Sequence, residues 1–278
     1  MKYRHAFHAG NFADVMKHAA LAAALARLTE KDRPLFLLDT HAGRGRYELP
    51  DTGGEAGAGI VRLLAARVEA PHPALARYLA LVRGMNDGLR LSAYPGSPLI
   101  EAAFMRSGDR AAFCELLEAE VEALRALFRG DARVGVHCRD GFEALAALLP
   151  PPEKRGLALI DPPYEEQERD FERVAAALVA AAARWPQGVL MAWYPIKLGA
   201  VAARLHRRIV DAGTRRVLAA ELCVHPDDSR AGLNGSGLLI VNPPWQLEED
   251  LRRILPSLHA ALAEDGAGRH DVLLLAGE

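Results

Sequence analysis

The segment Asp161-Pro162-Pro163-Tyr164 brings a carboxylate, two prolines and an aromatic ring together directly after the apolar run 156–160. Consecutive prolines hold the backbone extended and lack an N–H group, so neighbouring carbonyl groups can face a ligand. A carboxylate and a carbonyl that accept the hydrogens of an exocyclic amine would localise its lone pair. The ring of Tyr164 offers a face on which a base could stack. We expect methyl transfer to a base amine, with Asp161, Pro163 and Tyr164 at the reaction site.

A second segment, Asn242-Pro243-Pro244-Trp245, has nearly the same composition and also follows an apolar run. The runs 217–224 and 238–243 are joined by a polar loop without a helix, so they should be antiparallel neighbours. One of the two then ends at the sheet edge opposite the reaction site. We expect Asn242 to lie at that far edge, and Pro243 and Pro244 to begin the last helix, near 246–263.

The loop 39–45, with the sequence DTHAGRG, follows the first apolar run of the chain. Glycines after a buried strand let a ligand approach the backbone, and open α/β sheets bind ligands at the carboxyl ends of their strands. The G-x-G spacing lacks the further residues of dinucleotide and nucleoside triphosphate loops, which favours a ligand without phosphates. Asp39, His41 and Gly43 are the candidate contacts. A tight turn with no ligand would have the same spacing.

Acidic residues follow two further apolar runs: Glu115 lies near the end of 111–116, and Asp140-Gly141 follows 133–138. A carboxylate at the end of a strand can accept hydrogen bonds from both ribose hydroxyls of an adenosine. Asp140 could accept from an adenine amine. Structural roles stay open for both, because Glu115 suits the start of a helix and Asp140 suits a helix N-cap.

Short apolar runs alternate with amphipathic helical stretches, which predicts a doubly wound α/β sheet. The runs lie at 34–40, 111–116, 133–138, 156–161 and 188–194, and helical stretches include 117–128 and 172–185. Asn11 followed by Asp14 resembles a capping box, for a helix that continues towards Lys31.

About seventy residues separate the first run from the second, far more than one crossover requires. Helical patterns near 56–69, 74–86 and 98–106 fill this interval. They predict one domain, 1–278, that carries a small helical insertion at 48–95.

Composition is that of an ordinary globular protein, with 50% hydrophobic and 25% charged residues and a net charge of −2, so overall charge does not indicate a nucleic-acid partner. Cys114, Cys138 and Cys223 form no close-spaced pair; the first two lie in apolar runs and are expected to be buried free thiols. The start of the chain lacks the apolar stretch of a signal peptide, and no apolar run is long enough to span a bilayer. We expect a cytoplasmic protein.

The chain also resembles one known family, the RlmJ adenine-N6-methyltransferases of bacterial 23S ribosomal RNA, essentially from end to end. The resemblance lies in these segments: YRHAFHAGNFADVMKH (3–18), LDTHAGRGRYEL (38–49), YPGSPLI (94–100), Glu115, RDGFEAL (139–145), LIDPPYE (159–165), WYPIK (193–197) and GSGLLIVNPPW (235–245). The proline motif alone is common to amino-methyltransferases of DNA, RNA and protein, whereas the first two segments are much more specific.

The resemblance implies a Rossmann-like class I methyltransferase that uses S-adenosyl-L-methionine and acts on 23S rRNA. The reaction needs no metal, and a monomer is the default expectation. Asp161 would accept from the adenine amine, with Tyr164 stacking on the base. Tyr3 would touch the RNA, and His5 would sit beside the cofactor or the base. The cofactor pocket would be lined by Lys17, His18, Asp39, His41, Gly43, Ser97, Glu115, Asp140 and Gly141.

Three other functions share part of this pattern. A DNA adenine methyltransferase would need the same chemical groups. A protein glutamine methyltransferase usually has Asn where this chain has Asp161, which counts against it. A non-catalytic RNA-binding module with the same fold would have no need of a cofactor pocket.

Overall fold

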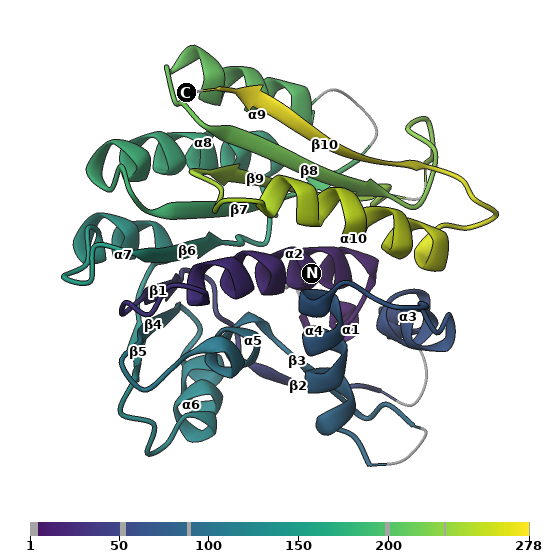
Figure 1. The fold of residues 1–278 in the computed structure, drawn as a ribbon, viewed down its shortest axis with the longest axis horizontal. Coiled ribbons are helices and arrows are strands. Elements are labelled where there is room, and N and C mark those ends of the chain that lie inside the picture. Colours follow the sequence, from purple (N-terminus) through teal and green to yellow (C-terminus); the bar gives the residue numbers. More distant parts are fainter. Residues whose placement is uncertain (1–4, 51–53, 88–89, 198–200, 231, 278) are drawn as a thin grey trace.

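The computed structural model describes residues 5–50, 54–87, 90–197, 201–230 and 232–277. Its centre is an 8-stranded sheet in the order β10-β8-β9-β7-β6-β1-β4-β5 (Figure 1). The strands are β1 (Phe36–Asp39), β4 (Arg110–Glu115), β5 (Val134–Cys138), β6 (Gly156–Ile160), β7 (Val189–Ile196), β8 (Val217–Cys223), β9 (Gly235–Val241) and β10 (Arg269–Ala276).

Strand direction divides this sheet into two parts. From β5 through β4, β1 and β6 to β7, every neighbouring pair is parallel. Beyond β7 the pairs are antiparallel, with β9 between β7 and β8 and with β10 at the outer edge. The predicted doubly wound sheet and the predicted antiparallel pair β8–β9 are both confirmed.

Helices cover both faces of the sheet (Figure 1). Side chains of β1 alternate between the two cores, since Leu37 packs in the core that includes α2 while Phe36 and Leu38 pack in the other. One face carries α2 (Phe12–Thr29), α5 (Ser97–Phe104), α6 (Glu118–Leu127) and α10 (Leu247–Leu262); the other carries α7 (Gly141–Leu148), α8 (Gln167–Arg184) and α9 (Val201–Asp211).

The interval between β1 and β4 holds the expected helical segments. They are the short η1 (Glu55–Ala58), α3 (Ile60–Ala65), α4 (Pro73–Gly84) and α5. The first three pack beyond α2 and α10 rather than on the sheet itself. Two strands that we did not expect, β2 (Arg46–Glu48) and β3 (Ala93–Pro95), pair antiparallel and bring the two ends of the interval together. Strands of three residues are too short to show a periodicity in the sequence.

The helix α2 begins where the sequence predicted. Asn11 is its N-cap, and the Asn11 side chain accepts a hydrogen bond from the Asp14 amide at 2.9 Å. The Asp14 carboxylate accepts from the backbone of Gly10 rather than from that of Asn11. This arrangement fixes the first turn of α2, and with it the position of Lys17 one turn later.

One cysteine prediction is wrong. Cys114 is buried as expected, but Cys138 is exposed, because it ends β5, the outermost strand of the sheet on this side. Among the described residues, no helix is both long and apolar enough to cross a bilayer. In the same part of the chain, no cluster of His, Cys, Asp and Glu has a metal-binding arrangement.

Candidate active site

Four acidic residues lie along one edge of the sheet, at the carboxyl ends of neighbouring parallel strands. Asp161 follows β6, Asp39 ends β1, Glu115 ends β4, and Asp140 follows β5. The strand order places them side by side in this sequence. The structure therefore brings together the acidic residues that the sequence proposed for base and cofactor.

The Asp161 carboxylate is paired with a buried lysine, Lys17, on α2. The Lys17 Nζ atom lies 2.5 Å from Asp161 Oδ2 and 2.8 Å from Asp14 Oδ1. Burial alone would lower the pKa of Lys17, but the two carboxylates raise it well above its ordinary value, so it stays an ammonium. The Asp161 side chain keeps 13% of its surface exposed, against 5% for Lys17. The Asp161 carboxylate is thus held in place and is still accessible from solvent.

Asp39 is fully buried beside the glycine loop. It accepts hydrogen bonds from the Ser97 hydroxyl at 2.5 Å and from the His41 amide at 3.1 Å. Burial raises the pKa of this carboxyl to about 7, although both hydrogen bonds oppose the rise. Ser97 is the first residue of α5, so the helix that follows the insertion orients the acid of the glycine loop.

Two glycines permit close backbone approach at this edge. Gly43 has a positive φ of 59°, and a Cβ atom there would meet the Tyr47 hydroxyl. The Gly43 amide donates to Glu115 Oε2 at 3.0 Å, which ties the loop after β1 to the end of β4. A Cβ atom at Gly141 would collide with the Thr40 carbonyl, so only glycine lets α7 begin this close to the loop.

The structural role considered for Asp140 is confirmed. Its carboxylate caps α7 by accepting from the Phe142 amide at 2.8 Å, and its other oxygen accepts from Arg173 at 2.7 Å. His41 lies against Phe142, with ring centroids 5.2 Å apart, and burial lowers the pKa of this imidazole to about 4. A neutral His41 therefore faces the acids at physiological pH.

The aromatic ring of Tyr164 is not exposed. Only 4% of the residue is accessible, and the ring packs against Phe171 and Trp193. Its hydroxyl donates to the Trp193 carbonyl at 2.6 Å. We expected the ring to offer a stacking face, whereas in this structure it supports the end of β7. Pro163, in contrast, is exposed at the surface.

Trp193 on β7 was named in the sequence only as part of the segment WYPIK, and it lies beside Lys17. The Lys17 Nζ atom stands 5.9 Å from the centroid of its ring, and Trp193 Nε1 donates to Ser236 at 2.9 Å. The side chain is only partly buried. The two adjacent aromatics Trp193 and Tyr194, on the strand next to β6, could have suggested this position.

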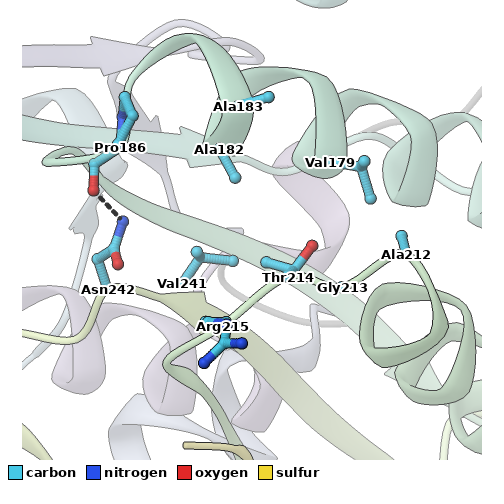
Figure 2. Close-up of a pocket in the computed structure, with 10 residues that line it drawn as sticks. All are labelled: Val179, Ala182, Ala183, Pro186, Ala212, Gly213, Thr214, Arg215, Val241 and Asn242. Atoms are coloured by element: carbon cyan, nitrogen blue, oxygen red, sulfur yellow. Dashed lines mark hydrogen bonds between the residues drawn. The ribbon is translucent and has the colours of Figure 1, made fainter. Parts of the chain in front are cut away.

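The segment at Asn242 lies at the opposite edge, as expected. Val241, the last residue of β9, pairs with Leu190 near the beginning of β7. The Asn242 side chain donates to the carbonyls of Pro186 and Gly188, at 2.9 and 3.0 Å, beside a cavity of about 320 Å³ (Figure 2). The expectation that Pro243 and Pro244 begin the last helix is wrong, because α10 begins at Leu247 after a turn.

Three remaining predicted residues belong to the N-terminal part of the chain. Tyr3 lies outside the described residues. His5 is the first residue of α1 (His5–His8). His18 on α2 is 1% exposed, and its Nδ1 atom lies 2.7 Å from the Tyr94 hydroxyl.

Comparison with known proteins gives one consistent family. The sequence family described as "Ribosomal RNA large subunit methyltransferase D, RlmJ" matches residues 32–274. The chain is 40% identical over 281 aligned positions to the ribosomal RNA large subunit methyltransferase J of Escherichia coli, with 98% of each chain covered. It is 41% identical over 273 positions to the protein of the same name from Haemophilus influenzae, with 96% of each covered.

A solved structure also shows the same fold over the whole chain. The crystal structure of a Legionella pneumophila protein superposes with a TM-score of 0.88 at 36% identity, covering 97% of this chain and 98% of the other. The fold described above is therefore shared with that protein.

Proposed function

This chain belongs to the RlmJ family of ribosomal RNA large subunit methyltransferases, and we propose that it methylates the exocyclic N6 of one adenine in 23S rRNA. It is an rRNA methyltransferase of the Rossmann-like class I fold and uses S-adenosyl-L-methionine. The observation that carries the N6 assignment is the Asp161 carboxylate, held by Lys17 beside Trp193 at the end of β6.

The residues at the carboxyl edge suit this cofactor. S-adenosyl-L-methionine is an adenosine joined to an amino acid through a sulfonium, so it carries positive charge and no phosphate. The acids Asp39, Glu115 and Asp140 provide acceptors, and Gly43 and Gly141 let Tyr47 and the start of α7 pack closely against the loop that follows β1. We propose that the cofactor is held by Lys17, His18, Asp39, His41, Gly43, Ser97, Glu115, Asp140 and Gly141.

In the proposed reaction, Asp161 acts on the amine of the base. An adenine amine is a poor nucleophile because its lone pair is delocalised into the ring. Hydrogen bonds from that amine to Asp161 and to a carbonyl of the proline turn localise the lone pair and orient it. The bound cofactor supplies an electrophilic methyl group. Asp161 is also the group placed to accept the proton that the methylated amine must lose.

Lys17 pairs with Asp14 as well as with Asp161, so it can release Asp161 during the reaction and still have a partner. When an amine approaches Asp161, the lysine can give up this contact and remain paired with Asp14. Its charge therefore stays compensated in a buried position. We propose that Lys17 holds the Asp161 carboxylate in position before the base arrives.

The base must leave its helix to reach Asp161, because N6 is engaged in pairing within a duplex. We propose that the base enters between Pro163 and the partly exposed ring of Trp193, with Tyr164 packed behind that ring. The insertion 48–95 and the N-terminal residues Tyr3 and His5 would contact the surrounding RNA.

The experiment that tests this proposal is mass mapping of 23S rRNA after incubation with the protein and S-adenosyl-L-methionine. We expect one N6-methyladenine per 23S molecule, none in duplex DNA of mixed sequence, and a monomer by light scattering. Methylation at another atom would overturn the N6 assignment. Preferential methylation of the DNA would contradict the assignment of 23S rRNA as the substrate.

A further inference from the structure

Arg173 is a charged residue of α8 that lies at the carboxyl edge and has no part in the function proposed above. Its Nη2 atom donates to Asp140 Oδ2 at 2.7 Å, and its guanidinium carbon lies 4.1 Å from the centroid of the Phe142 ring. The Phe142 ring in turn meets His41, with ring centroids 5.2 Å apart. Arg173 is therefore joined, directly or through one ring, to two residues of the proposed cofactor pocket.

The two oxygens of the Asp140 carboxylate are engaged to different extents. Oδ1 caps α7 and accepts from two amides, those of Phe142 at 2.8 Å and of Glu143 at 3.1 Å. Each oxygen of an ionised carboxylate has about two acceptor sites, so Oδ1 is fully occupied. Among the described residues, Arg173 is the one donor to Oδ2. Oδ2 can therefore accept one further hydrogen bond, and the side chain keeps 24% of its surface exposed.

Arg173 controls both the charge and the direction of this carboxylate. Burial alone would raise the pKa of Asp140, but the hydrogen bond from Arg173 and the amides of the cap lower it below its ordinary value. The cap fixes the position of Oδ1. The bond from Arg173 then fixes the direction in which Oδ2 points.

The helix that carries Arg173 also contacts the turn at Asp161. Phe171, two residues before Arg173, packs against the Tyr164 ring with centroids 4.8 Å apart. The Arg173 side chain is half exposed, so its ion pair with Asp140 adds little to stability. The contact therefore has more bearing on the orientation of Asp140 than on the fold.

We propose that Arg173 is a positioning residue for cofactor binding, which directs Asp140 Oδ2 towards the exocyclic amine of the cofactor's adenine and supports His41 through Phe142. The proposal rests on the assignment of Asp140 and His41 to the cofactor pocket. In this arrangement an N–H group of the adenine donates to Oδ2. A purine with an oxygen in place of that amine would lose the bond.

The first test is calorimetry of the full chain with S-adenosylhomocysteine, which does not depend on methyl transfer. R173M removes the charge and the donors but keeps a long side chain over Phe142. We expect its Kd to be about 3- to 10-fold higher than that of the wild type, the effect of about one lost hydrogen bond. For S-inosylhomocysteine, whose purine lacks the amine, the two proteins should bind alike.

A double-mutant cycle tests whether Arg173 acts through Asp140. D140N keeps the helix cap, because Asn caps helices as well as Asp does, but it loses the charge that pairs with Arg173. R173M should therefore raise the Kd clearly less in the D140N background than in the wild type. Fully additive effects would overturn the proposal.

A second readout needs no cofactor. A ¹³C NMR titration of aspartate side chains reports the pKa of Asp140, with D140N used to assign the signal. We expect R173M to raise this pKa, because the strongest interaction that lowers it is lost. An unchanged pKa would show that Arg173 does not hold the charge of Asp140, and would overturn the proposal.

The matched control is R184M. Arg184 is the last residue of α8, and its Nη1 atom donates to the Ala146 carbonyl near the end of α7, at 2.9 Å. The variant removes a contact between the same two helices without changing a neighbour of Asp140. We expect R184M to alter neither the Kd nor the pKa of Asp140.

The outcomes separate this proposal from the cofactor assignment on which it rests. Wild-type affinity in R173M, or an equal loss of affinity in R184M, would overturn the role of Arg173 alone. A wild type that fails to bind S-adenosylhomocysteine would contradict the cofactor assignment, and the role of Arg173 with it.

Discussion

Two turns of nearly the same sequence, Asp161-Pro162-Pro163-Tyr164 and Asn242-Pro243-Pro244-Trp245, lie at opposite edges of one sheet. In the first, the polar side chain is partly exposed and paired with Lys17, and the aromatic ring is buried. In the second, the polar side chain is bound to two backbone carbonyls, and Trp245 is 83% exposed. The two turns therefore differ in the exposure of the aromatic ring and in the partner of the polar side chain.

Strand direction explains the difference. β6 is parallel to β1 and ends beside the glycine loop, whereas β9 is antiparallel to β7 and ends where β7 begins. A turn at the carboxyl edge meets α2, Lys17 and the acids of neighbouring strands. The turn at the other edge contacts Pro186 and Gly188, just before β7, and Arg216, just before β8. The comparison shows that the neighbours of a short motif, and so its possible function, depend on the edge of the sheet at which its strand ends.

The largest expected effect is on methyl transfer by D161N. Removing the charge that orients the amine should lower kcat by about 10²- to 10³-fold. The Kd for S-adenosylhomocysteine should change little, because the turn itself is retained. The measurement is single-turnover methyl transfer to 23S rRNA at saturating cofactor.

The matched variant at the other edge is N242D, which exchanges the same two functional groups in reverse. We expect methyl transfer per folded molecule to stay at the wild-type level. If N242D reduced methyl transfer as much as D161N, the two turns would not be functionally distinct. The claim that only the Asp161 turn takes part in methyl transfer would then be wrong.

The two tryptophans provide the next contrast. W193L should lower kcat/KM for RNA by about 10- to 100-fold, because stacking on a base contributes about 1–3 kcal/mol. W245L should leave kcat/KM unchanged, since Trp245 lies at the far edge. Equal losses in the two variants would place RNA on both edges.

We expect the turn at Asn242 to contribute to stability. N242A removes two donors to the carbonyls of Pro186 and Gly188, and should lower the free energy of unfolding by about 1–3 kcal/mol. Urea unfolding followed by circular dichroism measures the change. A variant as stable as the wild type would show that these two bonds do not hold the turn.

The smallest expected effect concerns pH and is confined to the carboxyl edge. Burial raises the pKa of Asp39 to about 7 in the folded protein, above the ordinary value of about 3.9 in the unfolded chain. The folded state thus holds the proton more tightly. Its contribution to stability is fully present below about pH 4 and is lost as the pH rises through 7.

The control for this dependence is D39N, which cannot titrate. Between pH 5 and pH 8, the wild type should lose about 1–2 kcal/mol of unfolding free energy that D39N keeps. Parallel curves for the two proteins would show that Asp39 is ionised throughout this range.

Much of this architecture could be predicted from sequence periodicity. Buried apolar runs located the strands, and the loop between β8 and β9 was too short for a crossover, which placed Asn242 at the far edge. The alternation of apolar runs and helical stretches also predicted parallel strands, and therefore that Asp39, Glu115, Asp140 and Asp161 lie at one edge of the sheet. These features depend on local patterns and on the rule that parallel strands share one carboxyl edge.

The rest depends on contacts between distant parts of the chain. Lys17 and Asp161 are separated by 144 positions, and no local pattern pairs them. Cys138 was misplaced because its exposure depends on β5 being the outermost strand. The burial of Tyr164 depends on Trp193 and Phe171, which reach it from other elements.

The central claim is that the target adenine is bound at the Asp161 edge. Its most direct test is a crystal structure of the protein with S-adenosylhomocysteine and adenosine monophosphate. We expect the adenine amine within hydrogen-bonding distance of Asp161, with the ring next to Trp193. A base bound at Asn242 and Trp245, or an amine that points away from Asp161, would contradict the account.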